Sequence, residues 1–220
     1  YKRELQHVNA VRWNPHHHCR MHLASAKGRE VIVWRLEDAA ATGVTTILRK
    51  HTSDVSDISW SQLEEHLLVS ASHSIFCWDT RAAQSPVQEW KVPGALTSHV
   101  SFNRRNAHLL ASSFLNQVRI WDLRKVQKPV LTIPAHLPKD TVTSLDWSHE
   151  SEYNLLTSGG GVINLWSVVT AAAKQLPSQA NPSVDGEGAF SVLQHKHVWR
   201  QPMQKVLFAP VGQVCLKFAR

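Results

Sequence analysis

The sequence predicts an all-β fold built from repeated units of four short antiparallel strands. The prediction rests on aromatic residues that recur at a near-constant spacing and on the strand-like segments around each of them. Nine tryptophans occur in 220 residues. Four of them are separated by 44, 43 and 45 residues: Trp34, Trp78, Trp121 and Trp166. A period of about 40–45 residues is typical of β-propeller blades.

A second aromatic set precedes the first by 18 to 21 residues and keeps the same order. Its members are Trp13, Trp60, Phe102, Trp147 and Phe208. Between the two sets lie a small-residue strand, such as Leu110–Ser112, and an alternating apolar strand, such as Val118–Trp121. A period of 2 is typical of strands. A fourth strand follows each tryptophan of the first set, which completes four strands per repeat.

These segments divide the chain into four complete repeats and an incomplete fifth. We expect the repeats at about residues 7–50, 51–95, 96–135, 136–169 and 197–218, with a loop insertion at 170–188. A propeller of seven blades needs about 300 residues at this period. We therefore expect a partial propeller of four blades and the start of a fifth, as part of a longer protein.

Composition excludes several classes of protein. Hydrophobic residues make up 43% of the chain, which excludes a disordered protein. The three cysteines are widely spaced, so we expect no disulfide framework and a reducing compartment. No apolar run approaches about 20 residues, so we expect no membrane insertion. The net charge of +7 is spread along the chain, and we expect pairs such as Arg104-Arg105 to be solvated loop charges, not a nucleic-acid site.

The dipeptides Trp78-Asp79 and Trp121-Asp122 recur at the ends of two predicted strands. Trp34-Arg35 and Trp166-Ser167 occupy the equivalent positions. His51 and His136 begin the second and fourth repeats. With these residues the sequence resembles the WD40-repeat family of propellers. The resemblance implies that the tryptophans, aspartates and histidines form the structural signature of each repeat.

Two segments read Trp-Asp-x-Arg and end in Arg81 and Arg124. In the WD40 family, two successive motifs of this kind are associated with docking to the adaptor of a cullin ubiquitin ligase. An arginine at a strand end can bind a partner's carboxylate or carbonyl with its planar fork. The alternative is a local Asp–Arg pair that closes the turn. Arg81 and Arg124 are thus candidate partner-binding residues.

We expect no catalytic, cofactor-binding or metal-ligating residues. No nucleophile, base and orienting acid follow a known spacing. The run His16–Cys19, with His22 nearby, has ligand types for zinc, but no second cluster completes a four-ligand site. Gly159-Gly160-Gly161 lacks the Lys-Ser/Thr ending of a phosphate loop, and we expect a tight turn between strands there.

Several segments, in this order, resemble a narrower group, the WD-repeat and RWD-domain subunits of GATOR-type and SEA-type complexes. The segments are Val11–Pro15, Val55–Trp60, Asn106–Ala111, Val118–Asp122, Ala135–Leu137, Leu145–Trp147 and Val198–Arg200. The resemblance implies a non-catalytic scaffold in amino-acid sensing upstream of the target-of-rapamycin complex. It implies protein subunits as partners, no small-molecule substrate, and a cytoplasmic location at the cytosolic face of the lysosomal membrane. The alternative function is a substrate receptor of a cullin-type ubiquitin ligase.

Overall fold

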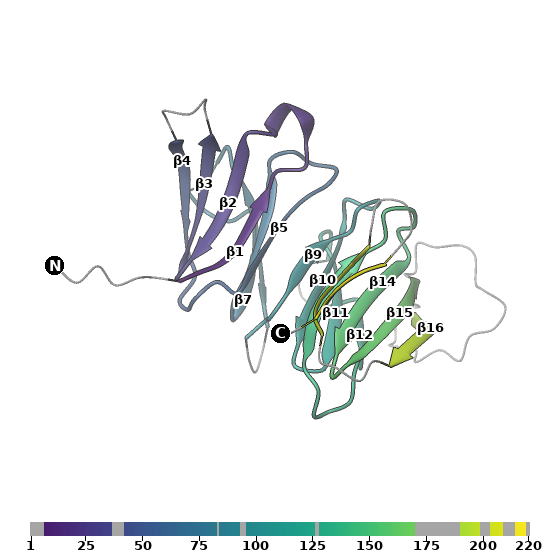
Figure 1. Cartoon of the computed structure of the whole chain (residues 1–220). Coiled ribbons are helices and arrows are strands. Elements are labelled where there is room, and N and C mark those ends of the chain that lie inside the picture. Colours follow the sequence, from purple (N-terminus) through teal and green to yellow (C-terminus); the bar gives the residue numbers. More distant parts are fainter. Residues whose placement is uncertain are drawn as a thin grey trace. The chain divides into compact units, whose positions relative to one another are not determined.

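Figure 1 shows the computed structural model of the chain. The structure describes residues 7–36, 42–82, 84–92, 96–125, 128–169, 190–198, 203–208 and 214–218. The loop insertion expected at 170–188 lies outside the described residues. The chain forms two compact units, residues 1–100 and 101–220.

The first unit holds two four-stranded antiparallel sheets, which we call blades 1 and 2. Blade 1 consists of β1 (Val8–Trp13), β2 (His22–Lys27), β3 (Glu30–Leu36) and β4 (Thr42–Arg49), paired in chain order. A short 3-10 turn, η1 (His17–Cys19), connects β1 and β2. Blade 2 consists of β5 (Asp57–Trp60), β6 (Leu67–Ala71), β7 (Ser74–Asp79) and β8 (Gln88–Lys91).

The second unit holds blades 3 and 4 and a two-stranded sheet. Blade 3 consists of β9 (Val100–Phe102), β10 (Leu109–Phe114), β11 (Gln117–Asp122) and β12 (Leu131–Ile133). Blade 4 consists of β13 (Val142–Trp147), β14 (Asn154–Gly159), β15 (Val162–Val169) and β16 (Phe190–Val198). The last two strands, β17 (Met203–Phe208) and β18 (Val214–Phe218), pair with each other.

The predicted all-β fold with four four-stranded antiparallel blades is confirmed. One boundary differs from the expectation. The fourth strand of blade 4 is β16, which extends to Val198 and pairs with β15 along its length. It therefore includes His197, where we expected the fifth repeat to begin. The two-stranded sheet of β17 and β18 starts six residues later, at Met203.

The turn between β14 and β15 confirms the interpretation of the three glycines. Gly160 and Gly161 have φ of 56° and 77°, a conformation that costs glycine little and other residues more. Positive φ at both central residues is the geometry of a two-residue hairpin turn. The segment therefore closes a hairpin and forms no phosphate loop.

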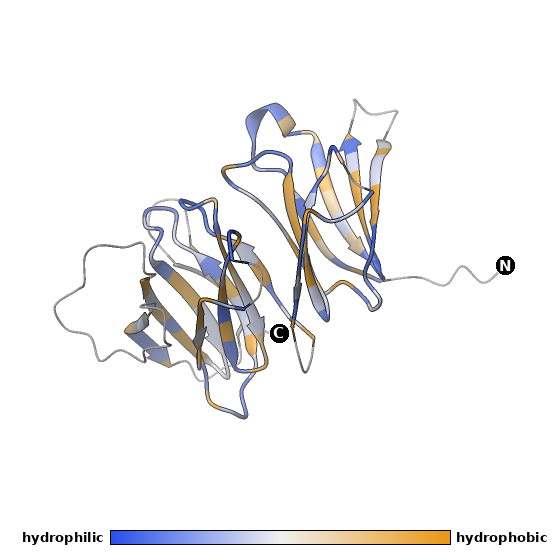
Figure 2. Cartoon of the chain, turned by 180° about the vertical axis from the view of Figure 1, so that it is seen from behind, coloured by the Kyte–Doolittle hydropathy of each residue, from blue (hydrophilic) through white to orange (hydrophobic). Residues whose placement is uncertain are grey.

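Each unit buries a hydrophobic cluster between its two blades. In the first unit, one cluster joins Val33 and Leu48 of blade 1 to Ile58, Trp60 and Trp78. In the second unit, one cluster joins residues of blade 3 to residues of blade 4 in the same way. Figure 2 shows the cause, since apolar and polar positions alternate along the strands. Each sheet thereby presents an apolar face to its neighbour.

Candidate protein-interaction site

The four tryptophans of the repeating set lie at the same place in their blades. Each is paired across the sheet with a leucine and donates from indole Nε1 to the hydroxyl two residues after that leucine. The bonds are Trp34–Ser25 at 2.8 Å, Trp78–Ser70 at 2.8 Å, Trp121–Ser112 at 2.9 Å and Trp166–Thr157 at 3.0 Å. This repeated bond fixes the register of the two middle strands and makes each blade a rigid support.

Two of these hydroxyls also contact a buried histidine. His51 Nε2 lies 2.6 Å from Ser70 Oγ, and His136 Nε2 lies 3.2 Å from Thr157 Oγ1. Burial is the main cause that lowers the pKa of both histidines to about 4. Both rings are therefore neutral at pH 7.

The two Trp-Asp-x-Arg segments form turns of the same geometry after β7 and β11. Arg81 donates from Nε to Asp79 Oδ1 at 3.0 Å and from Nη2 to Asp79 Oδ2 at 2.7 Å. Arg124 donates in the same way to Asp122, at 2.9 and 2.7 Å. The backbone N–H of each arginine also donates to that carboxylate, at 2.9 Å in both turns. The local Asp–Arg pair, one of the two alternatives from sequence, is present in both turns.

These turns present accessible charged corners. The hydrogen bonds from Arg81 are the largest cause that lowers the pKa of Asp79, to about 2, and those from Arg124 lower the pKa of Asp122. The side chains of Arg81 and Arg124 are nevertheless 67% and 57% exposed. Each turn therefore offers a preorganised guanidinium to solvent, which a partner can contact at low entropic cost.

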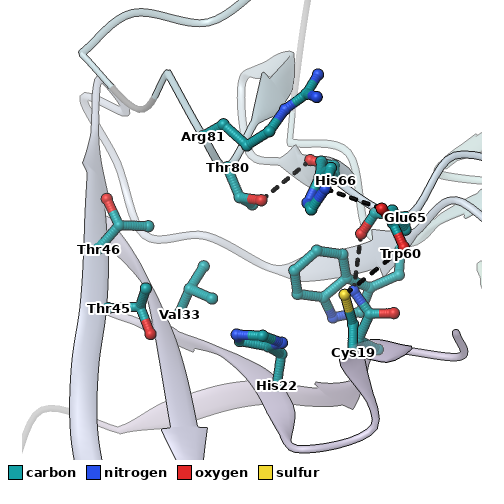
Figure 3. A pocket seen from close by; sticks show the side chains of 11 residues that line it. Cys19, His22, Val33, Thr45, Thr46, Trp60, Glu65, His66, Thr80 and Arg81 are labelled. Carbon is teal, nitrogen blue, oxygen red and sulfur yellow. Dashed lines mark hydrogen bonds and ion pairs between the residues drawn. The ribbon is translucent and has the colours of Figure 1, made fainter. Parts of the chain in front are cut away.

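A pocket of about 400 Å³ lies beside the first of these turns, between blades 1 and 2 (Figure 3). Its apolar lining includes Val33 of β3 and Trp60 of β5, both buried. His22 of β2 faces it from blade 1, and Glu65 and Arg81 line it from blade 2. The pocket therefore combines apolar surface with charged groups at one place.

Several polar groups of the pocket bind one another. The Glu65 carboxylate lies 3.1 Å from His66 Nε2 and 3.9 Å from the thiol of Cys19. The Thr80 hydroxyl donates to the backbone carbonyl of His66 at 3.2 Å. Asn14 Nδ2 donates to the backbone carbonyl of Glu65 at 2.9 Å, which fixes the β5–β6 connection against blade 1. These contacts hold the pocket wall in one arrangement.

The structure brings no metal site together from the candidate histidines. Among the described residues, no group of three or more His, Cys, Asp and Glu could hold a metal ion. His17 and His18 stack edge-to-face within η1. His16 Nε2 contacts the carbonyl of Ser61 at 3.2 Å, and the thiol of Cys19 points to Glu65.

The sequence did not predict two ion pairs that join neighbouring blades. Asp57 is buried and accepts a 2.7 Å bond from Arg12 of blade 1. Asp146 is buried and accepts a 2.9 Å bond from Arg104 of blade 3. The expectation that Arg104 is a solvated loop charge is therefore wrong, because it binds the carboxylate of Asp146, which lies on β13, 42 residues later in the sequence. An aspartate within each of these predicted strands was the available signal, since buried charges are paired.

The similarity of this chain to known proteins agrees with the four-stranded blades described above. The family model described as WD domain, G-beta repeat matches residues 43–79 and 127–167. The chain contains WD40 repeats. Each match begins near the fourth strand of one blade and ends in the third strand of the next. The sequence repeat of the WD40 family is therefore offset by one strand from the sheets.

The chain is similar to several curated proteins, two of which are named as GATOR2 complex proteins. The chain is 38% identical to the GATOR2 complex protein WDR59 of Homo sapiens over 69% of this chain and 15% of that protein. It is 38% identical to GATOR2 complex protein Wdr59 of Drosophila melanogaster over 55% of this chain and 13% of that protein. It is 25% identical to maintenance of telomere capping protein 5 of Saccharomyces cerevisiae over 72% of this chain and 14% of that protein. The chain thus spans about one seventh of the length of these relatives.

Within the described ranges, no helix has the length and apolar character that crossing a membrane requires.

Proposed function

We propose that the chain is a protein-interaction scaffold within a multi-subunit complex of the GATOR type. The similarity to proteins named as GATOR2 complex proteins, which extends over 69% of this chain, carries the proposal. The geometry supports it, because each blade is internally fixed by its Trp–Ser/Thr bond and presents turns and strand ends at its edges. Loops on a rigid support are a common way to build a binding surface. The proposal includes no chemical step.

We also propose a signalling pathway and a cellular location for this scaffold. A GATOR-type scaffold acts in amino-acid sensing upstream of the target-of-rapamycin complex, at the cytosolic face of the lysosomal membrane. This part rests on the resemblance in sequence order and spacing. It assigns other protein subunits as partners and assigns neither a nucleic acid nor a small-molecule substrate.

Reconstitution tests the scaffold proposal directly. The full-length protein that contains this chain is mixed with purified GATOR2-type subunits that lack their own WDR59-like member, and the mixture is separated by size. The proposal predicts co-elution of the protein with the other subunits. It predicts loss of co-elution when Trp78→Ala and Trp121→Ala together disrupt two blades. Separate elution of the intact protein would refute the scaffold role.

The twin Asp–Arg turns favour a second candidate, a substrate receptor of a cullin-type ubiquitin ligase. Both turns have the same bonding pattern and an accessible guanidinium. The double variant Arg81→Ala and Arg124→Ala should abolish binding of the ligase adaptor if this candidate is right. Arg49→Ala is the matched control, because Arg49 is also an exposed arginine, paired to Glu30 at 2.6 Å. Adaptor binding that survives the double change removes this candidate.

A further inference from the structure

The pocket between blades 1 and 2 has room for a guest side chain. Its volume of about 400 Å³ exceeds what one amino-acid side chain fills, and it opens beside Arg81 (Figure 3). Val33 and the ring of Trp60 give it apolar surface. Such a surface suits the methylene stem of a long side chain, which can keep its polar end at the mouth.

Most of the atoms in the pocket that can still form a hydrogen bond are acceptors. Each oxygen of the Glu65 carboxylate can accept two hydrogen bonds, and its contacts with His66 Nε2 at 3.1 Å and with the Cys19 thiol at 3.9 Å leave acceptor capacity free. The Thr80 hydroxyl gives its hydrogen to a carbonyl, so only its lone pairs are left. A guest that donates hydrogen bonds fits these groups.

Charge at the pocket mouth favours a cation. Asp79 already neutralises Arg81 through two hydrogen bonds, and Glu64 and Glu65 add negative charge. The pKa of Arg81 is raised, first by Asp79 and then also by Glu65 and Glu64. The pKa of the Cys19 thiol is raised by burial and then by Glu65, so a negative charge is disfavoured at the same place. Glu64 and Glu65 therefore favour a basic guest over an acidic one.

We propose that this pocket receives a lysine or arginine side chain from an extended segment of a partner protein. The stem lies along the pocket wall formed by Trp60 and Val33, and the cationic head donates hydrogen bonds to the Glu65 carboxylate. A ring such as Trp60 adds attraction for a nearby cation. The inference concerns this pocket alone and does not rest on the proposed function.

Small probes test the inference on the 220-residue chain. The probes are the N-acetyl, N-methylamide derivatives of arginine and lysine, and the controls are those of norleucine and glutamate. Backbone amide shifts of Thr46, His66 and Thr80 are followed by NMR at constant ionic strength, up to about 20 mM probe, since one side chain binds in the millimolar range. We expect saturable shifts at these residues with a basic probe and none with the glutamate probe.

Two variants separate the charge of the pocket from its shape. Glu65→Gln removes the carboxylate charge but keeps the backbone carbonyl that Asn14 binds, so the fold is preserved. It should weaken binding of the basic probe about fivefold or more, because bonds to a charged acceptor are roughly twice as strong as neutral ones. Glu30→Gln is the control, since Glu30 is an exposed carboxylate of blade 1 paired with Arg49. It should leave binding unchanged.

Three results would overturn the inference. The first is the absence of shifts with both basic probes. The second is an equal response to norleucine, which would mean that the pocket selects only an apolar stem. The third is equal binding by the Glu65→Gln and Glu30→Gln variants, which would mean that the carboxylate at the pocket does not hold the guest.

Discussion

The indole Nε1 of Trp60 in blade 2 donates a hydrogen bond of 3.1 Å to the backbone carbonyl of Arg12 in blade 1. Trp147 of blade 4 makes the equivalent bond of 3.3 Å to the carbonyl of Ser101 in blade 3. In both cases the carbonyl belongs to the residue just before the aromatic residue of the preceding blade. Trp60 and Trp147 of the second aromatic set therefore join neighbouring blades, whereas the tryptophans of the first set join strands within a blade.

Trp60 should matter far more for stability than Trp13, although both belong to the same aromatic set. Trp60 is 4% exposed and Trp13 is 56% exposed. Trp60→Ala should lower the free energy of unfolding by about 3–5 kcal/mol, as expected for a large buried truncation. Trp13→Ala should lower it by less than about 1 kcal/mol. Urea unfolding measures both, and equal losses would mean that the blade packing is different.

Ser70 is predicted to hold the interior of blade 2 together. Ser70→Ala leaves the Nε1–H of Trp78 and the Nε2 of His51 without this partner in a buried place. The free energy of unfolding should fall by about 1–3 kcal/mol, the cost of unsatisfied buried polar groups.

Ser53→Ala is the matched control for that change. Ser53 Oγ also lies 2.6 Å from a histidine nitrogen, that of His73, but this pair is exposed to water. Water replaces the lost bond, so the change should cost less than about 0.5 kcal/mol. A loss at Ser53 as large as that at Ser70 would show that burial does not set the cost.

The two buried histidines should make the chain less stable in mild acid. Their folded pKa is lowered to about 4, whereas an unfolded histidine titrates near 6.5. The unfolded state therefore binds more protons between these values, and stability falls as pH drops from about 6.5 towards 4. Between pH 7 and pH 5 the loss should be on the order of 1–2 kcal/mol per histidine.

Denaturant unfolding at the two pH values checks this prediction. The double variant His51→Gln and His136→Gln lacks both titrating groups, so the part of the pH dependence that they cause should disappear. Its absolute stability at pH 7 is expected to be lower, but the comparison uses only the difference between pH 7 and pH 5. An unchanged difference would mean that these rings are already charged when folded, or that they are exposed.

Gly160 should not tolerate a side chain, whereas Gly43 should. An added Cβ at Gly160 would lie 2.2 Å from Cγ of Asp140, and φ there is +56°. Gly160→Ala should therefore lower the free energy of unfolding by about 1–3 kcal/mol. At Gly43 nothing lies within 4 Å of an added Cβ, so Gly43→Ala should change it by less than about 0.5 kcal/mol. Thermal unfolding of the pair measures the contrast, and a neutral Gly160→Ala would contradict the turn geometry.

The strands and their pairing could be predicted because their signals are local and repeat. The spacing of Trp34, Trp78, Trp121 and Trp166 and the period-2 segments before them are properties of neighbouring residues. The fourth strand of blade 4 was harder to delimit. Its partner strand β15 precedes it by a segment of about twenty residues, and the pairing, not the local sequence, extends β16 to Val198.

The pocket and the ion pairs between blades could not be predicted in this way. Asp57 and Arg12 are 45 residues apart, and Cys19 and Glu65 are 46 apart. Their contacts exist only because two blades pack at one angle and place these strand ends together. Sequence reasoning did find Arg81, but it could not show that the guanidinium is already bound to Asp79 or that a pocket opens beside it.

Quantitative purification of the full-length protein from cells, at near-physiological salt concentration, tests the scaffold account most directly. Co-purifying proteins are identified and counted by mass spectrometry. The account predicts other GATOR-type subunits in near-stoichiometric amounts. Recovery of a cullin adaptor without those subunits, or of no subunit in comparable amount, would contradict it.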